Sequence, residues 1–208
     1  MTAAADRQAT GLAVARGHGL LPAGATLLAG AAVLFFGART IPVPAILSVL
    51  EVRTALSTVA CLFFALAALQ TLTEPAPALA ITSPRSWHKT RALRLSLAVL
   101  VCITTAIGVD AGHTSVKVAA TVLLLTTEGT LVAALAGVRL AWILPVTHLL
   151  AALVFGFGAL GQPRAWAFFV ADTVPKLALA PLIMAYVATT VWWATRLPSD
   201  SSNELAEG

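Results

Sequence analysis

Glu128 and His148 are the two residues whose types and spacing could carry chemistry inside this apolar chain. Glu128 lies eleven positions from both Lys117 and Arg139, in the middle of an apolar segment. His148 lies nine positions after Arg139, in the next apolar segment. If both segments are helices joined by a short turn, a rise of about 1.5 Å per residue places both side chains about 14–16 Å from that turn. We therefore predict that the two residues form an intramembrane polar pair.

Such a pair has two interpretations, which the sequence leaves open. A Glu–His pair could relay protons or bind a polar substrate, or it could be a structural hydrogen bond that joins two helices. A charge near the bilayer midplane costs at least ~2.5–3.5 kcal/mol, so Glu128 should face the bundle interior, be paired or be protonated. Next to it, Gly129, Ala133 and Gly137 form a stripe of small residues that predicts a tight helix contact.

The composition places these residues in a membrane. The chain is 59% hydrophobic and 11% charged, whereas soluble domains carry about 25% charge. So few charges could not cover a surface that faces water. We predict an all-α, multi-pass helix bundle in the cell membrane. The net charge of +4 does not indicate nucleic-acid binding, because the basic residues lie at span ends, where anionic headgroups explain them.

Apolar segments of about 20 residues can cross the hydrocarbon core, and we expect about six of them. They form a single membrane domain, 20–196, between a polar segment, 1–19, and a disordered acidic tail, 197–208. Residues 41–53 could be an interfacial helix or the start of the second span. The expected spans are 20–38, 54–73, 93–109, 116–138, 140–160 and 177–195.

The segment 83–94, SPRSWHKTRALR, is the densest cationic run of the chain, and we call it the basic island. Ser83 followed by Pro84 is a helix-start signature, so we expect an amphipathic helix at the membrane surface that bends into the third span. Cytoplasmic loops retain Lys and Arg, which places the island and both termini in the cytoplasm. The residues expected to contact headgroups or a partner protein are Arg85, Trp87, Lys89, Arg91 and Arg94.

Motifs of enzymes and cofactor sites are missing from the sequence. There is no GxxxxGK[ST] phosphate loop, no HExxH zinc helix, no GxSxG elbow and no CxxC pair. Cys61 and Cys102 lie inside apolar runs, as packing residues do. We therefore expect no catalytic residue, metal site or cofactor, although an intramembrane enzyme that uses Glu128 and His148 remains a third alternative.

Three stretches resemble the six-span permease subunits of ABC-type exporters, in the form common in high-GC actinobacteria. They are SPRSWHKTRALRLSLAVL after the second span, GVRLAWILPVTHLLAALVFG at the fifth, and GQPRAW before the last. The resemblance implies that 83–94 contacts a separate ATPase subunit and that 41–53 and 161–173 are gate-side structures. It also implies a homodimer or a paired permease chain. The loop before the last span is shorter than is usual in that family.

Two functions from different classes therefore stand side by side. The first is a permease-like subunit that moves a hydrophobic or amphipathic compound with a separate ATPase partner. The second is a stand-alone membrane protein, either an accessory or immunity protein or a proton-coupled carrier that uses Glu128 and His148. The basic island distinguishes the first function, and the polar pair distinguishes the carrier.

Overall fold

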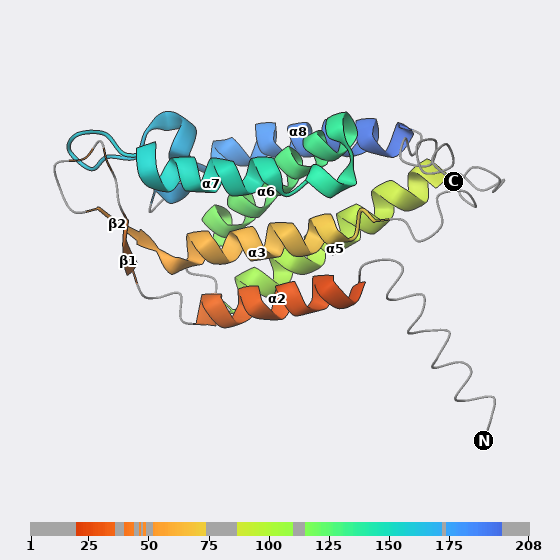
Figure 1. Ribbon diagram of the computed structural model, residues 1–208, viewed down its shortest axis with the longest axis horizontal. Helices are drawn as coiled ribbons and strands as arrows, with labels where there is room; N and C mark the ends of the chain where they lie inside the picture. The colour runs from red at the N-terminus through yellow and green to blue at the C-terminus, as the bar shows by residue number, and fades with distance from the viewer. Residues whose placement is uncertain are drawn as a thin grey trace, which may run out of the picture.

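The computed structural model describes residues 20–35, 40–43, 46, 48, 52–73, 87–109, 115–171 and 174–196. Within these residues six α-helices run side by side along the long axis of the molecule (Figure 1). The predicted all-α class is confirmed. The helices are α2 (Leu20–Phe35), α3 (Leu56–Gln70), α5 (Trp87–Val109), α6 (Ser115–Ala136), α7 (Ile143–Phe155) and α8 (Leu179–Thr195).

Four segments of the described chain are long and apolar enough to cross a membrane. They are His88–Val109, Ser115–Ala136, Val138–Phe155 and Lys176–Thr195. The helices α2 and α3 are also apolar but have only 16 and 15 residues. The predicted membrane-protein class therefore follows from the structure, whereas the count of six spans remains a prediction.

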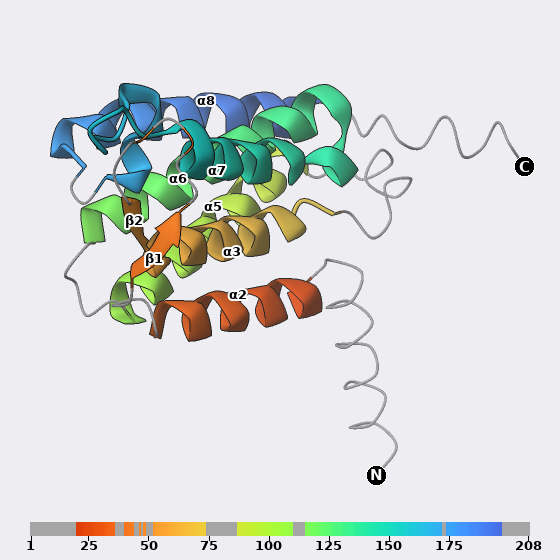
Figure 2. The same cartoon turned by 60° about the vertical axis from the view of Figure 1, so that its left-hand side comes forward.

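The helix α6 lies at the centre of the bundle and contacts α3, α5, α7 and α8. Figure 2 shows α2 at the edge of the molecule against α3, on the side opposite α8. Buried threonines of α6 return their hydroxyl groups to the helix backbone: Thr127 donates to the carbonyl of Leu123 at 2.6 Å and Thr130 to that of Thr126 at 2.7 Å. Such back-bonding satisfies hydroxyl groups that have no access to water.

A two-stranded antiparallel hairpin lies at one end of the bundle, which we call the hairpin end (Figure 1). Its strands are β1 (Thr40–Val43) and β2 (Val52–Ala55), paired from Thr40–Ala55 to Val43–Val52. The prediction of an interfacial helix or an early second span over 41–53 was therefore wrong for the residues that form β1 and β2. Proline lacks the N–H group that a helix interior needs, and an edge strand tolerates Pro42.

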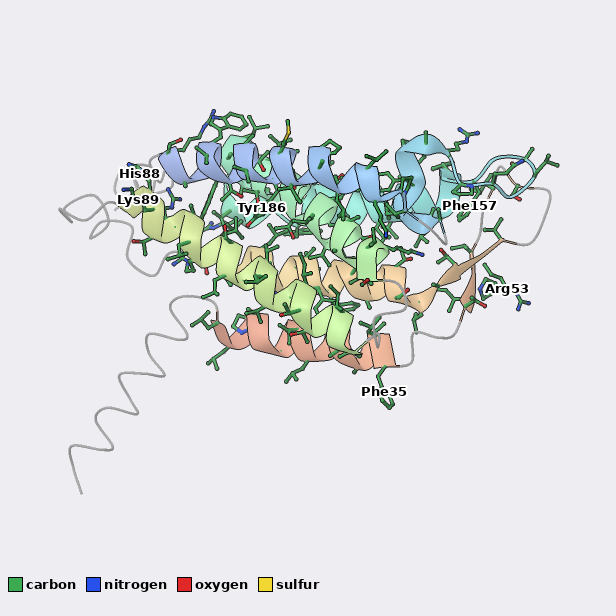
Figure 3. The ribbon with its side chains drawn as sticks, turned by 180° about the vertical axis from the view of Figure 1, so that it is seen from behind. Phe35, Arg53, His88, Lys89, Phe157 and Tyr186 are labelled. Carbon is green, nitrogen blue, oxygen red and sulfur yellow. The ribbon has the colours of Figure 1, made fainter. Side chains whose placement is uncertain are left out.

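The opposite end, which we call the basic end, holds the start of α5 and the end of α8 (Figure 1). Figure 3 shows His88 and Lys89 there, far from Arg53 and Phe157 at the hairpin end. The helix α5 runs without interruption for 23 residues, so the expected surface helix and third span form one helix from Trp87 onward. Ser83 and Pro84, which predicted the helix start, lie outside the described residues, as do 1–19 and 197–208.

The turn between α6 and α7 depends on Gly137, whose φ of 95° is a conformation that glycine adopts without strain. It ends α6 and leads into the short helix η1 (Val138–Leu140). Gly137 is therefore a turn residue and not part of the helical stripe predicted with Gly129 and Ala133. The two other members of that stripe are buried in α6.

The helix α7 ends at Phe155, earlier than the expected end of the fifth span at residue 160. The chain then turns through a β-bridge between Phe157 and Pro163 and continues as the short helix η2 (Ala165–Val170). A further short helix, η3 (Lys176–Ala178), leads into α8. The GQPRAW segment thus does more than connect two spans, because it brings η2 back against α7.

Two apolar cores hold these elements together. The larger one joins α3, α5, α6 and α8, and it contains Cys61 and Cys102 as buried thiols. A smaller core at the hairpin end joins β2, α7 and η2 through Val52, Leu149 and Phe169. The two segments that the resemblance implies to be gate-side structures therefore meet in this second core.

Candidate functional site

Glu128 and His148 are in direct contact between α6 and α7. The ring nitrogen Nδ1 of His148 is hydrogen-bonded to Oε1 of Glu128. The side chain of Glu128 is 14% exposed and that of His148 is 20% exposed, so both are largely removed from the surroundings of the bundle. The antiparallel course of two adjacent helices joined by a short turn produces this contact, as the residue spacing predicts.

Two aromatic rings of η2 enclose the imidazole on its other sides. The ring of Trp166 stacks on His148 with a centroid separation of 5.9 Å, and the ring of Phe169 meets it edge-on at 5.0 Å. Phe169 is fully buried, whereas Trp166 is 42% exposed. Sequence reasoning placed Trp166 in the loop before the last span and missed both contacts. The run AWAFFV was the available signal, because so many aromatic and apolar residues after a polar turn favour a packed segment.

Gly129, the neighbour of Glu128, lets α6 approach both α3 and the start of the α7 span closely. A Cβ atom added at Gly129 would lie 2.2 Å from a methyl carbon of Leu69 on α3 and 2.8 Å from the carbonyl oxygen of Ala141 before α7. Only a residue without a side chain permits this approach. Ala141 lies two residues before α7 begins. The contact at Gly129 therefore also determines how far along the bundle axis His148 lies relative to Glu128.

The second carboxyl oxygen of Glu128, Oε2, is buried and has no hydrogen-bond partner among the described residues. The helices packed nearby supply no counter-charge, since the sequences of α3 and η2 contain no charged residue. The nearest cations along the chain, Lys117 and Arg139, are each eleven positions away. Buried polar atoms are normally satisfied, so an unsatisfied carboxyl oxygen marks a place where a proton, a water molecule or a ligand donor can bind.

The pair can therefore hold one proton in two ways. Either the carboxylate of Glu128 faces an imidazolium at His148, or the protonated acid donates to a neutral imidazole. The two forms differ by the transfer of one proton along a single hydrogen bond. Both forms have zero net charge, which suits a site inside apolar helices. Loss or gain of a further proton would leave a net charge there.

Comparison of the chain with protein-family models, with curated proteins and with solved structures found no match. Within the described part of the chain, no group of three or more His, Cys, Asp or Glu side chains is arranged to hold a metal ion.

Arg91 of the basic island belongs to the bundle interior. It is 6% exposed, and its Nη1 donates to the backbone carbonyl of Arg196 at 2.7 Å and to that of Ala194 at 3.4 Å. Its guanidinium group also lies 4.4 Å from the ring centroid of Trp193. His88 is hydrogen-bonded through Nδ1 to the carbonyl of Ala194 at 2.8 Å. Both residues thus satisfy carbonyls at the end of α8, where a helix leaves its last carbonyls without partners.

A second arginine continues these contacts to the central helix. Nη1 of Arg196 donates to the carbonyl of Ala134, in the last turn of α6, at 2.7 Å, and its guanidinium lies 4.5 Å from the ring centroid of Trp192. The island therefore divides. Arg91 is a packing residue, Lys89 is exposed and Arg94 is partly buried, whereas Arg85 and the side chain of Trp87 lie outside the described part of the structure.

Proposed function

We propose that this protein is a multi-pass membrane carrier in which the Glu128–His148 pair takes up and releases a proton. The observation that carries the proposal is the buried, unpartnered Oε2 of Glu128. That oxygen can accept a proton or a hydrogen-bond donor, and a buried polar atom without a partner costs about 1–3 kcal/mol. An open carboxyl oxygen beside an imidazole is suited to proton exchange.

The proposed topology has six spans with both termini in the cytoplasm. Supporting it, α2 begins and α8 ends at the same end of the bundle, and successive helices alternate in direction (Figure 1). The helices α2 and α3 are apolar, like the four longer segments that could cross a membrane. We place the basic end in the cytoplasm, because it carries the basic island.

Labelling with an apolar carbodiimide tests the proton site without knowledge of the cargo. Such reagents enter lipid and react with protonated carboxyl groups. The purified protein is treated in detergent or liposomes at a series of pH values, and the labelled residue is identified by peptide mass spectrometry. We expect Glu128 to be the labelled residue and the extent of labelling to vary across the pH series, because the reagent needs the protonated acid. Glu128→Gln should lose the label, and His148→Gln should change its pH dependence.

Two results would contradict the proposal. One is the absence of any label on Glu128 between acidic and alkaline pH in a folded protein. The other is a label whose extent does not change with pH or with substitution of His148. Thermal unfolding of each variant shows whether it is folded, and Thr147→Ser, one residue from His148 on the exposed side of α7, is a matched control.

The second candidate, a permease subunit that works with a separate ATPase, also retains support. Six apolar helices and a basic segment that runs into the start of α5 fit that layout. Because Arg91 is buried and Lys89 is exposed, Lys89 is a cation of the island that a partner could contact directly. Co-purification of an ATPase that is weakened by Lys89→Glu in a protein of unchanged stability would favour this function. A wild-type protein purified from its native membrane without an ATPase would count against it.

A further inference from the structure

The bundle is closed tightly between Glu128 and the basic end. One residue beyond Glu128, the space beside Gly129 is filled by the side chain of Leu69 and the carbonyl of Ala141. Further on, Ala134 is buried, and its carbonyl accepts the hydrogen bond from Arg196. Four elements, α3, α6, α8 and the start of the α7 span, thus meet in direct contact on this side of the pair.

The cover on the other side of the pair is different in kind. There the imidazole contacts the rings of Trp166 and Phe169 in η2, a six-residue helix in which Ala167 has non-helical backbone angles. Trp166 stacks on His148, and 42% of Trp166 is exposed. This one side chain therefore contacts the pair and also reaches the surface of the molecule. The adjoining turn carries the exposed polar residues Gln162 and Arg164. Exposed polar residues therefore lie close to Trp166 in the chain, together with the exposed Leu160 of the same turn.

We propose that protons reach the Glu128–His148 pair from the hairpin end, past the side chain of Trp166. The inference rests on the proposed proton-exchanging function and adds its direction and its entry residue. At the hairpin end the exposed ring that contacts the imidazole belongs to a single side chain, whereas on the basic-end side α6 is in contact with α3 and with Arg196 at the end of α8. Trp166 is a positioning residue, because its ring covers the imidazole of His148 and does not itself exchange a proton.

A carbodiimide that is water-soluble and does not cross lipid tests the direction. It is added to right-side-out and to inside-out vesicles that contain the full-length protein, and the labelled fraction of Glu128 is measured by mass spectrometry. With the hairpin end outside, Trp166→Ala should increase labelling severalfold, and Trp166→Phe, which keeps a ring, should stay near wild type. Trp142→Ala, which removes a 53% exposed indole at the α6–α7 turn of the basic end, should change nothing.

The outcomes separate this inference from the proposed function. Labelling of Glu128 mainly from the basic end, or labelling that Trp166→Ala does not change, would overturn the entry route while the apolar reagent still marks a proton site. If neither reagent labels Glu128 in a folded protein, the proposed function itself fails. If Trp166→Ala does not fold, an alkylation test of Gln162→Cys and Thr195→Cys from each side, with Glu128 labelling in the same vesicles, still identifies the side of entry.

Discussion

Nη1 of Arg91 donates a hydrogen bond to the backbone carbonyl of Arg196 at 2.7 Å, which joins the start of α5 to the end of α8. Residues separated by more than a hundred positions therefore close the basic end of the bundle. This contact shows that the cationic run of the sequence includes a buried residue that holds two helices together. A loss of function after neutralisation of Arg91 would report a damaged bundle and not a lost partner.

Replacement of Arg91 by glutamine should destabilise the protein, because two carbonyls at the end of α8 lose a buried donor. Each unsatisfied group costs about 1–3 kcal/mol, so the thermal unfolding midpoint in detergent should fall by several degrees. Lys89→Gln, two positions away on the same helix and exposed, is the control and should leave the midpoint unchanged. Equal effects of the two substitutions would show that Arg91 is not a packing residue.

Gly129→Ala should disturb the Glu128–His148 pair indirectly, since its new methyl group would overlap Leu69 and the carbonyl of Ala141. Overpacking of this kind costs about 1–3 kcal/mol, and here it should also push the start of the α7 span away from α6. Both the unfolding midpoint and the carbodiimide labelling of Glu128 should change. At Gly108 on α5 the added methyl group meets nothing within 4 Å, so Gly108→Ala should be neutral or mildly stabilising. Tolerance of alanine at Gly129 would contradict the close contact among α3, α6 and the start of the α7 span.

A double-mutant cycle measures the energy of the polar pair. Glu128→Gln, His148→Gln and the double variant are compared by their free energies of unfolding. Interhelical polar pairs in membrane proteins contribute about 0.6 kcal/mol on average and up to about 1.7 kcal/mol, and we expect a coupling energy within this range. Additive effects of the two single substitutions would mean that the residues do not interact in the folded protein.

Phe169→Ala should loosen η2, because the ring of Phe169 is fully buried and contacts His148 edge-on. Loss of a buried phenylalanine side chain costs about 3–5 kcal/mol in soluble cores. Limited proteolysis should consequently cut the segment between α7 and α8 faster than in the wild type. Phe155→Ala is the matched control, since that ring is 47% exposed and its loss leaves η2 in place. Identical digestion of both variants would refute a role of Phe169 in holding η2.

Features that depend on local sequence were predictable. The apolar segments follow from hydropathy, and the level of Glu128 relative to His148 follows from helical rise and a short turn. The helix α5 and the central position of an acid in α6 needed no tertiary information.

Features that depend on long-range packing were not. The pairing of β1 with β2 joins two separate stretches of the chain, and the periodicity of 41–53 does not reveal it. The burial of Arg91 depends on the carbonyls of Ala194 and Arg196, which no local pattern brings near. The aromatic cover of His148 likewise requires that η2 fold back on α7.

Infrared spectroscopy of the carboxyl C=O stretch tests the central claim most directly. The wild-type protein and Glu128→Gln are compared in lipid across a pH series. We predict a protonated carboxylic acid absorption within the pH series that is absent from Glu128→Gln and that changes in His148→Gln. A difference spectrum with no protonated-acid band assignable to Glu128 at any pH would contradict a proton-exchanging pair.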